Sequence, residues 1–132
     1  MSQREKLSDP DPNRQAVRAF ADDSEPIAET LGEIREGIDE IDQEIIRLLG
    51  ERSLLVRDAA RFKKALNEVP ALKRQHAQFE NLRKLAEAQE SPLEGFPELV
   101  EELYRSLIPG FVELQKTAFE DTVLIDNPDE VD

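Results

Sequence analysis

Cationic and amide side chains interrupt the apolar stripes of the helices that this sequence predicts. Buried positive charge needs a counter-charge, and the stripes themselves hold almost no acidic residues. We therefore expect a ligand with carboxylate groups to supply the missing negative charge. The residues concerned are Arg52 and Lys63 on a first stripe, Arg74 and Gln75 on a second, and Gln115 on a third.

Each of these residues taken singly also has a structural explanation. An arginine in a helix seam extends its head to water or pairs with a carboxylate, and a glutamine can set coiled-coil register. Residues 52–84 carry nine Lys or Arg against three Asp or Glu, within a chain of net charge −13. This local excess fits either a solvated basic face or a site for a small anion. The acidic total argues against nucleic acid as a partner.

The apolar spacing predicts an all-α chain of three helices, of which the first is very long. This helix is expected over about residues 25–66, and its apolar stripe advances in steps of three and four, a 3.5-residue period. About 40 residues span about 60 Å, which exceeds the width of a domain of this size. We therefore expect this helix to pair with the same helix of a second copy. The stripe positions are Leu31, Ile34, Ile38, Ile41, Ile45, Leu48, Arg52, Leu55, Ala59, Phe62 and Leu66.

Proline residues predict where the other helices begin and bend. Pro70 ends the first helix, so we expect the second over residues 71–89. The third should begin at Ser91–Pro92 or at Pro97. Pro109 should kink it, because proline removes a backbone hydrogen bond. Its inward positions include Leu107, Phe111 and Gln115.

Composition sets the remaining boundaries. We expect a flexible polar arm over residues 1–23 with a helical turn near residues 15–20, a helical domain over 24–119 and an acidic tail over 120–132. The chain has no cysteine, which excludes disulfides and cysteine-ligated zinc. It has neither an apolar leader nor an apolar run long enough to cross a membrane, so a soluble cytoplasmic protein is expected.

The spacing of three basic residues predicts a site shared between two chains. Arg52 and Lys63 are eleven residues apart, so on one helix they lie within about 20° of the same face and about 16 Å apart. Two long side chains can close on a small dianion between them. Arg35 lies seventeen residues before Arg52, about 25 Å away, too far to reach the same molecule. In an antiparallel dimer whose first helices cross near Ile46, the partner's Arg35 would fall near residue 57.

The stretch LGEIREGIDEIDQEIIRLLGERSLLVRDAARFK, residues 31–63, resembles the first helix of the all-helical (type II) chorismate mutases. The shared pattern is an "IR" start, an Asp seven residues later, "LL.ER" ten residues further on, and a Lys eleven residues after that Arg. The resemblance covers about residues 28–118. It implies an intertwined antiparallel homodimer of three-helix chains and the rearrangement of chorismate to prephenate, without metal or cofactor.

The resemblance also implies roles for individual residues. Arg35 would reach across the dimer to one substrate carboxylate, and Arg52 would hold a carboxylate within its own chain. Lys63 would contact a carboxylate and the ether oxygen, and Gln115 would donate to the same oxygen. Such a site positions the substrate and stabilises charge on the ether oxygen. The catalytic candidates are Lys63, Gln115 and Arg52, and the substrate-binding candidates are Arg35, Arg52, Lys63, Arg74, Gln75, Ala71 and Phe111.

Some positions depart from the usual mutase pattern. Ala71 and Gln75 stand where bacterial mutases often have Asp and Glu near the ring hydroxyl. Ala59, the string "ARFK" and Phe111 resemble the isochorismate pyruvate lyases, which share the fold and the cationic site. Chorismate is the preferred substrate, with isochorismate pyruvate lyase and aminodeoxychorismate mutase as alternatives. The alternative outside enzymes is a helical dimerisation module.

Overall fold

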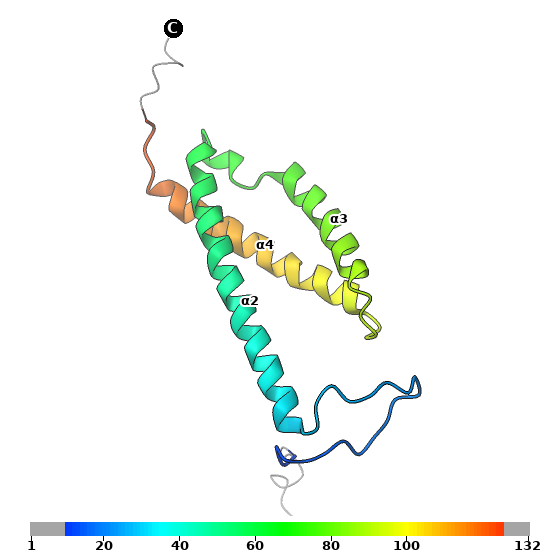
Figure 1. Ribbon diagram of the computed structural model, residues 1–132. Helices are drawn as coiled ribbons and strands as arrows, with labels where there is room; N and C mark the ends of the chain where they lie inside the picture. Colours follow the sequence, from blue (N-terminus) through cyan, green and yellow to red (C-terminus); the bar gives the residue numbers. More distant parts are fainter. Residues whose placement is uncertain (1–9, 126–132) are drawn as a thin grey trace, which may run out of the picture. The chain divides into compact units, whose positions relative to one another are not determined.

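The computed structural model describes residues 10–125 and is all-α, with three helices joined by short connections (Figure 1). The elements are α2 (Leu31–Ala59), the 3₁₀ turns η1 (Ala60–Phe62) and η2 (Leu66–Glu68), α3 (Leu72–Ala88) and α4 (Phe96–Glu120). The chain divides into two compact units, one ending at Gly50 and the other beginning at Glu51, so the boundary falls inside α2. No helix of residues 10–125 is long and apolar enough to cross a bilayer.

Helix α2 is shorter at both ends than the helix predicted over residues 25–66. It begins at Leu31 because the Thr30 hydroxyl accepts the Glu33 N–H at 3.2 Å, while the Glu33 carboxylate reaches back to the Glu29 N–H at 3.4 Å. This arrangement resembles a capping box, which the string Thr-x-x-Glu signals in the sequence. At the other end α2 gives way to η1, and Lys63 follows in extended conformation.

Backbone groups of the N-terminal arm complete the start of α2. The Leu31 N–H donates to the Arg14 carbonyl at 3.0 Å, and the Gly32 N–H donates to the Pro12 carbonyl at 2.7 Å. Two of the first N–H groups, which no helix can pair internally, are satisfied in this way. A Cβ at Gly32 would lie 3.0 Å from the Pro12 oxygen, a tight contact that glycine avoids.

The arm was predicted to contain a helical turn near residues 15–20, and that prediction is wrong. Residues 15–20 are not helical, and Gln15 instead forms an isolated antiparallel bridge with Thr30. The bridge joins the arm to the segment just before α2. Residues 1–9 of the predicted flexible arm and 126–132 of the predicted tail lie outside the described residues.

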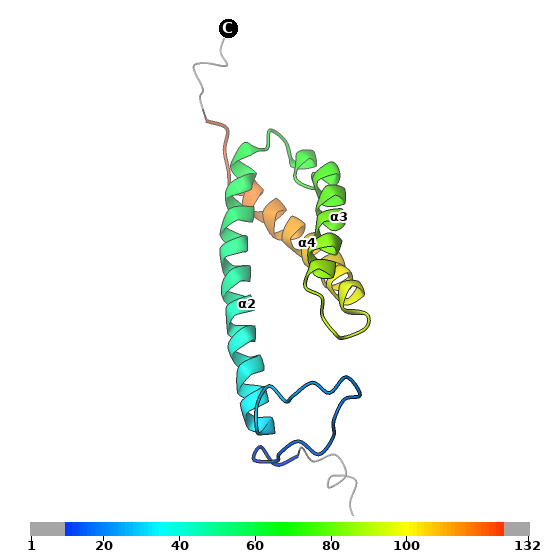
Figure 2. The ribbon, with the colours of Figure 1, turned by 45° about the vertical axis from the view of Figure 1, so that its right-hand side comes forward.

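The second unit is built on a hairpin of α3 and α4, with η1 packed against α4 (Figure 2). Its buried apolar residues are Ala60, Val69, Ala86 and Ile108. The observed bounds of α3 agree with the predicted ones to within a residue, and α4 begins next to Pro97, one of its two predicted starts. Gly95 precedes α4 with φ +88°, a conformation that favours glycine. Helix α4 continues through Pro109, and Ile108 rather than Leu107 is buried there.

Candidate functional site

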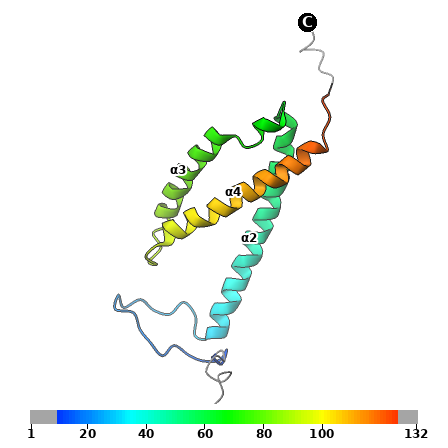
Figure 3. The same cartoon turned by 180° about the vertical axis from the view of Figure 1, so that it is seen from behind.

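Seven of the eight candidate residues belong to the second unit, and Arg35 belongs to the first. The seven residues of the second unit come from the last turns of α2, the connection that follows it, the start of α3 and the second half of α4 (Figure 3). The seven are Arg52, Lys63, Ala71, Arg74, Gln75, Phe111 and Gln115.

Arg52 and Phe111 form the first contact between α2 and α4. The Arg52 Cζ lies 4.5 Å from the centre of the Phe111 ring, a cation–π geometry. Arg52 is half-buried, and its Nη1 is the one buried side-chain nitrogen or oxygen of residues 10–125 without a hydrogen-bond partner. A buried charged donor left unpaired is costly. The geometry therefore suits an anion that arrives at Nη1 while Phe111 supports the guanidinium plane.

Gln115 forms the second contact, one helical turn away. It is 7% exposed, and its Nε2 donates to the Val56 carbonyl at 2.5 Å. Val56 follows Arg52 by four residues and Gln115 follows Phe111 by four, so each pair lies on one helix face. The two contacts are thus in register. Because an amide nitrogen carries two N–H groups, one remains for a ligand.

The sequence predicted that Lys63 lies on the same helix as Arg52, and this prediction is wrong. Lys63 lies beyond the end of α2. It follows η1 with φ −96° and ψ 131°, and its N–H donates to the Ala60 carbonyl at 3.2 Å. The spacing calculated for a continuous helix therefore does not hold beyond Ala59. Lys63 is half-buried, and its position depends on the connection between η1 and α3.

Ala71, Arg74 and Gln75 are grouped at the start of α3. Ala71 immediately precedes the helix with φ +44°, in the left-handed region that a Cβ disfavours. The Gln75 Nε2 donates to the Pro70 carbonyl, while Arg74 is exposed. The contacts found for these residues are local. No hydrogen bond or ring contact among residues 10–125 joins them to Arg52, Phe111 or Gln115.

Three of the candidate basic residues have no nearby counter-charge in the part of the chain that the structure describes: Arg52, Lys63 and Arg74. None of the three forms an ion pair with a carboxylate among residues 10–125, whereas several other basic residues of this range do. In particular, Arg83 binds Glu87, Glu98 and Glu101, and Arg61 binds Asp58. These three cations are therefore available to a ligand with negative charge.

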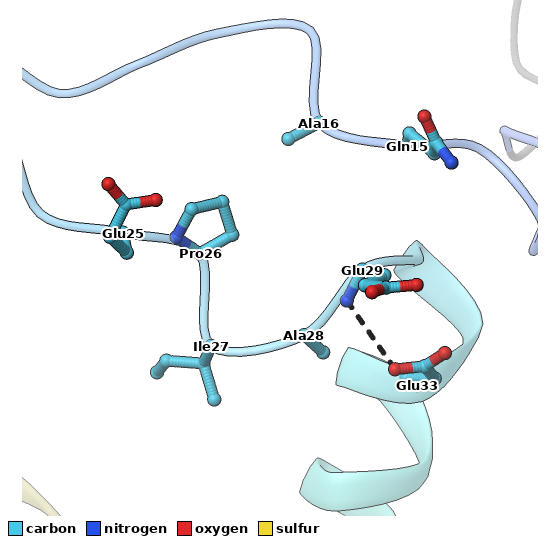
Figure 4. A pocket seen from close by; sticks show the side chains of 8 residues that line it. All are labelled: Gln15, Ala16, Glu25, Pro26, Ile27, Ala28, Glu29 and Glu33. Atoms are coloured by element: carbon cyan, nitrogen blue, oxygen red, sulfur yellow. Dashed lines mark hydrogen bonds between the residues drawn. The ribbon is translucent and has the colours of Figure 1, made fainter.

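Neither of two open pockets contains the candidate residues. One, of about 700 Å³, lies in the first unit and is lined in part by Glu25, Glu29 and Glu33, where the Glu29 N–H meets the Glu33 carboxylate (Figure 4). Its acidic lining would repel a dicarboxylate. The other, of about 800 Å³, lies between α3 and α4, and its Arg83 is already engaged by carboxylates.

Several residues that hold the candidate site residues in place were not identified from residue types and spacing in the sequence. The Val56 and Pro70 carbonyls accept hydrogen bonds from Gln115 and Gln75, and Glu68 closes the connection that follows Lys63. A backbone carbonyl has no residue-type signal, because every residue carries one. For Glu68 a signal exists, since a glutamate at the third position of a helical turn often reaches back to cap it.

Comparison with known proteins connects this geometry to a family. The family model described as chorismate mutase type II matches residues 34–116. All eight candidate residues, from Arg35 to Gln115, fall within the matched range. The search of curated proteins found no match.

Proposed function

Because the chain belongs to the chorismate mutase type II family, its reaction is the isomerisation of chorismate to prephenate, and we propose that its cationic residues carry that reaction. The family also implies a role in aromatic amino acid biosynthesis. The observation that carries the site assignment is Arg52, whose Nη1 is buried without a partner above the Phe111 ring. A substrate carboxylate is the acceptor that this nitrogen lacks.

Each remaining residue has a task that its type suits. Arg52 and Arg74 bind carboxylate oxygens, because guanidinium donors match them geometrically. Lys63 approaches a carboxylate and the ether oxygen. Gln115 uses one N–H on the Val56 carbonyl and directs the other to the ether oxygen.

In this isomerisation the ether C–O bond breaks while a C–C bond forms within the same molecule. No proton or electron is exchanged with the protein, so neither a general base nor a nucleophile is needed. The site accelerates the reaction by holding the compact reactive conformer and by stabilising negative charge on the departing ether oxygen. In this proposal Gln75 and Ala71 contribute to recognition of the ring hydroxyl.

We propose that two copies of the chain form the working enzyme, with the partner subunit's Arg35 completing each site. Support comes from α2, which has no buried residue. Three isoleucines of its apolar stripe are exposed in the single chain, Ile38 by 53%, Ile41 by 61% and Ile45 by 47%. Such an apolar face is stabilised when another helix covers it. A second copy supplies a helix with the same stripe.

Mixing of inactive subunits tests this shared site. Arg35→Ala and Arg52→Ala should each be nearly inactive. When the two variants are mixed equally and exchange subunits, half of the dimers are hybrids and each hybrid holds one intact site. About a quarter of the sites should therefore be restored. Restored prephenate formation supports the proposal. If the mixture stays as inactive as its components while hybrids form, Arg35 acts within its own chain or not at all.

The substrate test compares chorismate with isochorismate, with prephenate, salicylate and pyruvate as readouts. We expect prephenate from chorismate. Salicylate and pyruvate from isochorismate would instead assign the site to the lyase reaction. No turnover and no binding of either dicarboxylate would favour a helical dimerisation module, in which Arg52→Ala changes dimer stability alone.

A further inference from the structure

The segment of residues 63–71, which we call the connecting segment, joins η1 to α3 and begins with Lys63 (Figure 2). Lys63 is not held by a regular α-helix, so the path of this segment determines where its ammonium group lies. The contacts that hold the connecting segment are therefore relevant to the reaction proposed above.

A glutamate closes the connecting segment directly beside Lys63. The Glu68 carboxylate accepts the N–H of Lys64 at 3.1 Å, and the Glu68 N–H donates to the Ala65 carbonyl at 3.0 Å. Together these bonds fold residues 64–68 into a closed loop around η2. The carboxylate satisfies the N–H that follows Lys63, and a charged acceptor gives the stronger kind of hydrogen bond.

The far end of the connecting segment is anchored independently. Val69 is only 2% exposed, and its N–H donates to the Leu66 carbonyl at 3.1 Å. The Pro70 carbonyl accepts a hydrogen bond from the Gln75 side chain, and Ala71 follows Pro70 with φ +44°. These contacts hold residues 69–71 against α3. The loop of residues 64–68 is thus the part whose shape depends on Glu68.

We propose that Glu68 is a positioning residue for Lys63, which it orients by holding the backbone N–H of Lys64. The proposal rests on the proposed function, in which Lys63 approaches the ether oxygen. Glu68 itself is exposed and does not touch the substrate. Its effect reaches the reaction through the backbone of residues 63 and 64.

Loss of the Glu68 carboxylate leaves the Lys64 N–H to water and removes one closure of the loop. Lys63 then samples a wider range of positions. Because misplacement by about 1 Å can cost about a hundredfold in rate, a looser Lys63 should lose roughly tenfold in kcat. KM should change less, because Arg52 and Arg74 still bind the carboxylates.

Three variants separate this role from general effects of charge or stability. Glu68→Ala removes both the charge and the acceptor, whereas Glu68→Gln removes the charge but keeps an oxygen that can accept the Lys64 N–H. Asn67→Ala, in the same turn, is the matched control, because Asn67 is exposed and no side-chain bond is found for it. Hydrogen exchange at the Lys64 amide reports the closure without reference to activity.

The expected result is faster exchange at Lys64 and roughly tenfold lower kcat in Glu68→Ala, with Glu68→Gln and Asn67→Ala close to wild type in both. Faster exchange with unchanged kcat would overturn the proposal, since the closure would then be structural only. Unchanged exchange would also overturn it. If wild-type protein turns over neither chorismate nor isochorismate, the proposed function fails and this inference fails with it.

Discussion

Arg52 and Gln115 represent two ways in which a buried polar side chain is placed. Gln115 is held by the Val56 carbonyl, whereas Arg52 rests on the Phe111 ring and keeps Nη1 unpaired. A nitrogen left in this state costs stability in the free protein. In the proposed site, that cost is recovered when a substrate carboxylate binds Nη1.

Arg52→Ala should lower kcat/KM. The expected loss of transition-state stabilisation is about 2–5 kcal/mol, because a charge-assisted partner in a desolvated site is removed. Circular dichroism should show an intact helical fold. Arg57→Ala, an exposed position one turn further along α2, serves as the control and should remain near wild type. Near-normal kcat/KM in Arg52→Ala would make Arg52 a structural residue.

Gln115→Glu should make activity depend on pH. A carboxylic acid donates only when protonated, and the ordinary pKa of glutamate is about 4.3. Burial and the Val56 carbonyl raise this pKa, while nearby cations lower it. The variant should therefore lose activity near pH 8 and recover toward pH 5, whereas wild type stays active at both.

Recovery of Gln115→Glu should be incomplete, because the acid has one proton where the amide has two. The Val56 carbonyl and the ether oxygen would compete for it. The comparison is kcat/KM of both proteins across the pH range, with circular dichroism to detect unfolding at acid pH. Parallel pH profiles of the two proteins would show that Gln115 does not face the reacting ether oxygen.

The helices owe their arrangement to contacts at their ends as well as along their faces. The start of α3 combines a strained Ala71 with Gln75, whose amide is tied to Pro70. A residue held in left-handed conformation at a candidate site indicates that surrounding contacts determine its backbone. The backbone of this turn is therefore held by its surroundings, and the Gln75 side chain is held by the Pro70 carbonyl.

Ala71→Asp combined with Gln75→Glu should change substrate choice more than rate. Aspartate tolerates the left-handed conformation better than alanine, and a carboxylate at position 75 cannot donate to Pro70 unless protonated. The measurement is the ratio of kcat/KM for chorismate to that for isochorismate. Ala71→Gly, which relieves the backbone without adding charge, is the control. A change below about threefold, roughly 0.7 kcal/mol, would show that these positions are not the selector.

An ion-pair network joins α3 to the beginning of α4. Arg83 bonds Glu98 at 3.0 Å and Glu101 at 3.1 Å across the helices, and Glu87 at 3.1 Å on its own helix. The pKa of Glu98 is lowered from 4.5, first by its own backbone N–H and then by Arg83. A lowered pKa stabilises the fold above pH 4.5, and the contribution is lost as the pH falls through the folded-state value.

Arg83→Gln should therefore lower Tm at pH 7 and have a smaller effect at acid pH, below the lowered pKa of Glu98. All partners are substantially solvent-exposed, so added salt should reduce the difference between the two proteins. Lys116→Gln removes an ion pair within α4 and is the control. An equal loss of Tm at both pH values would show that Arg83 acts through packing.

Apolar side chains along α2 are exposed in the single chain, and in the arrangement we propose a second copy covers them. We expect a dimer at micromolar concentration whose first helices run antiparallel and cross near Ile45–Leu49. The absence of native cysteine offers a direct measurement. A Leu48→Cys variant should form a disulfide between subunits, because bridged Cα atoms lie within about 7 Å. Ile38→Cys should not. A monomer, or efficient bridging at position 38, would contradict this arrangement.

The sequence alone indicated three helices, the approximate bounds of α3 and α4, and a set of cations without counter-charge. These features depend on local spacing and on prolines, which act within a few residues. The C-terminal end of α2, the position of Lys63, and the pairing of Arg52 with Phe111 and of Gln115 with Val56 emerged only from the tertiary structure. The reason is physical: periodicity reports which face of a helix is apolar, but contacts 59 residues apart determine which face it meets.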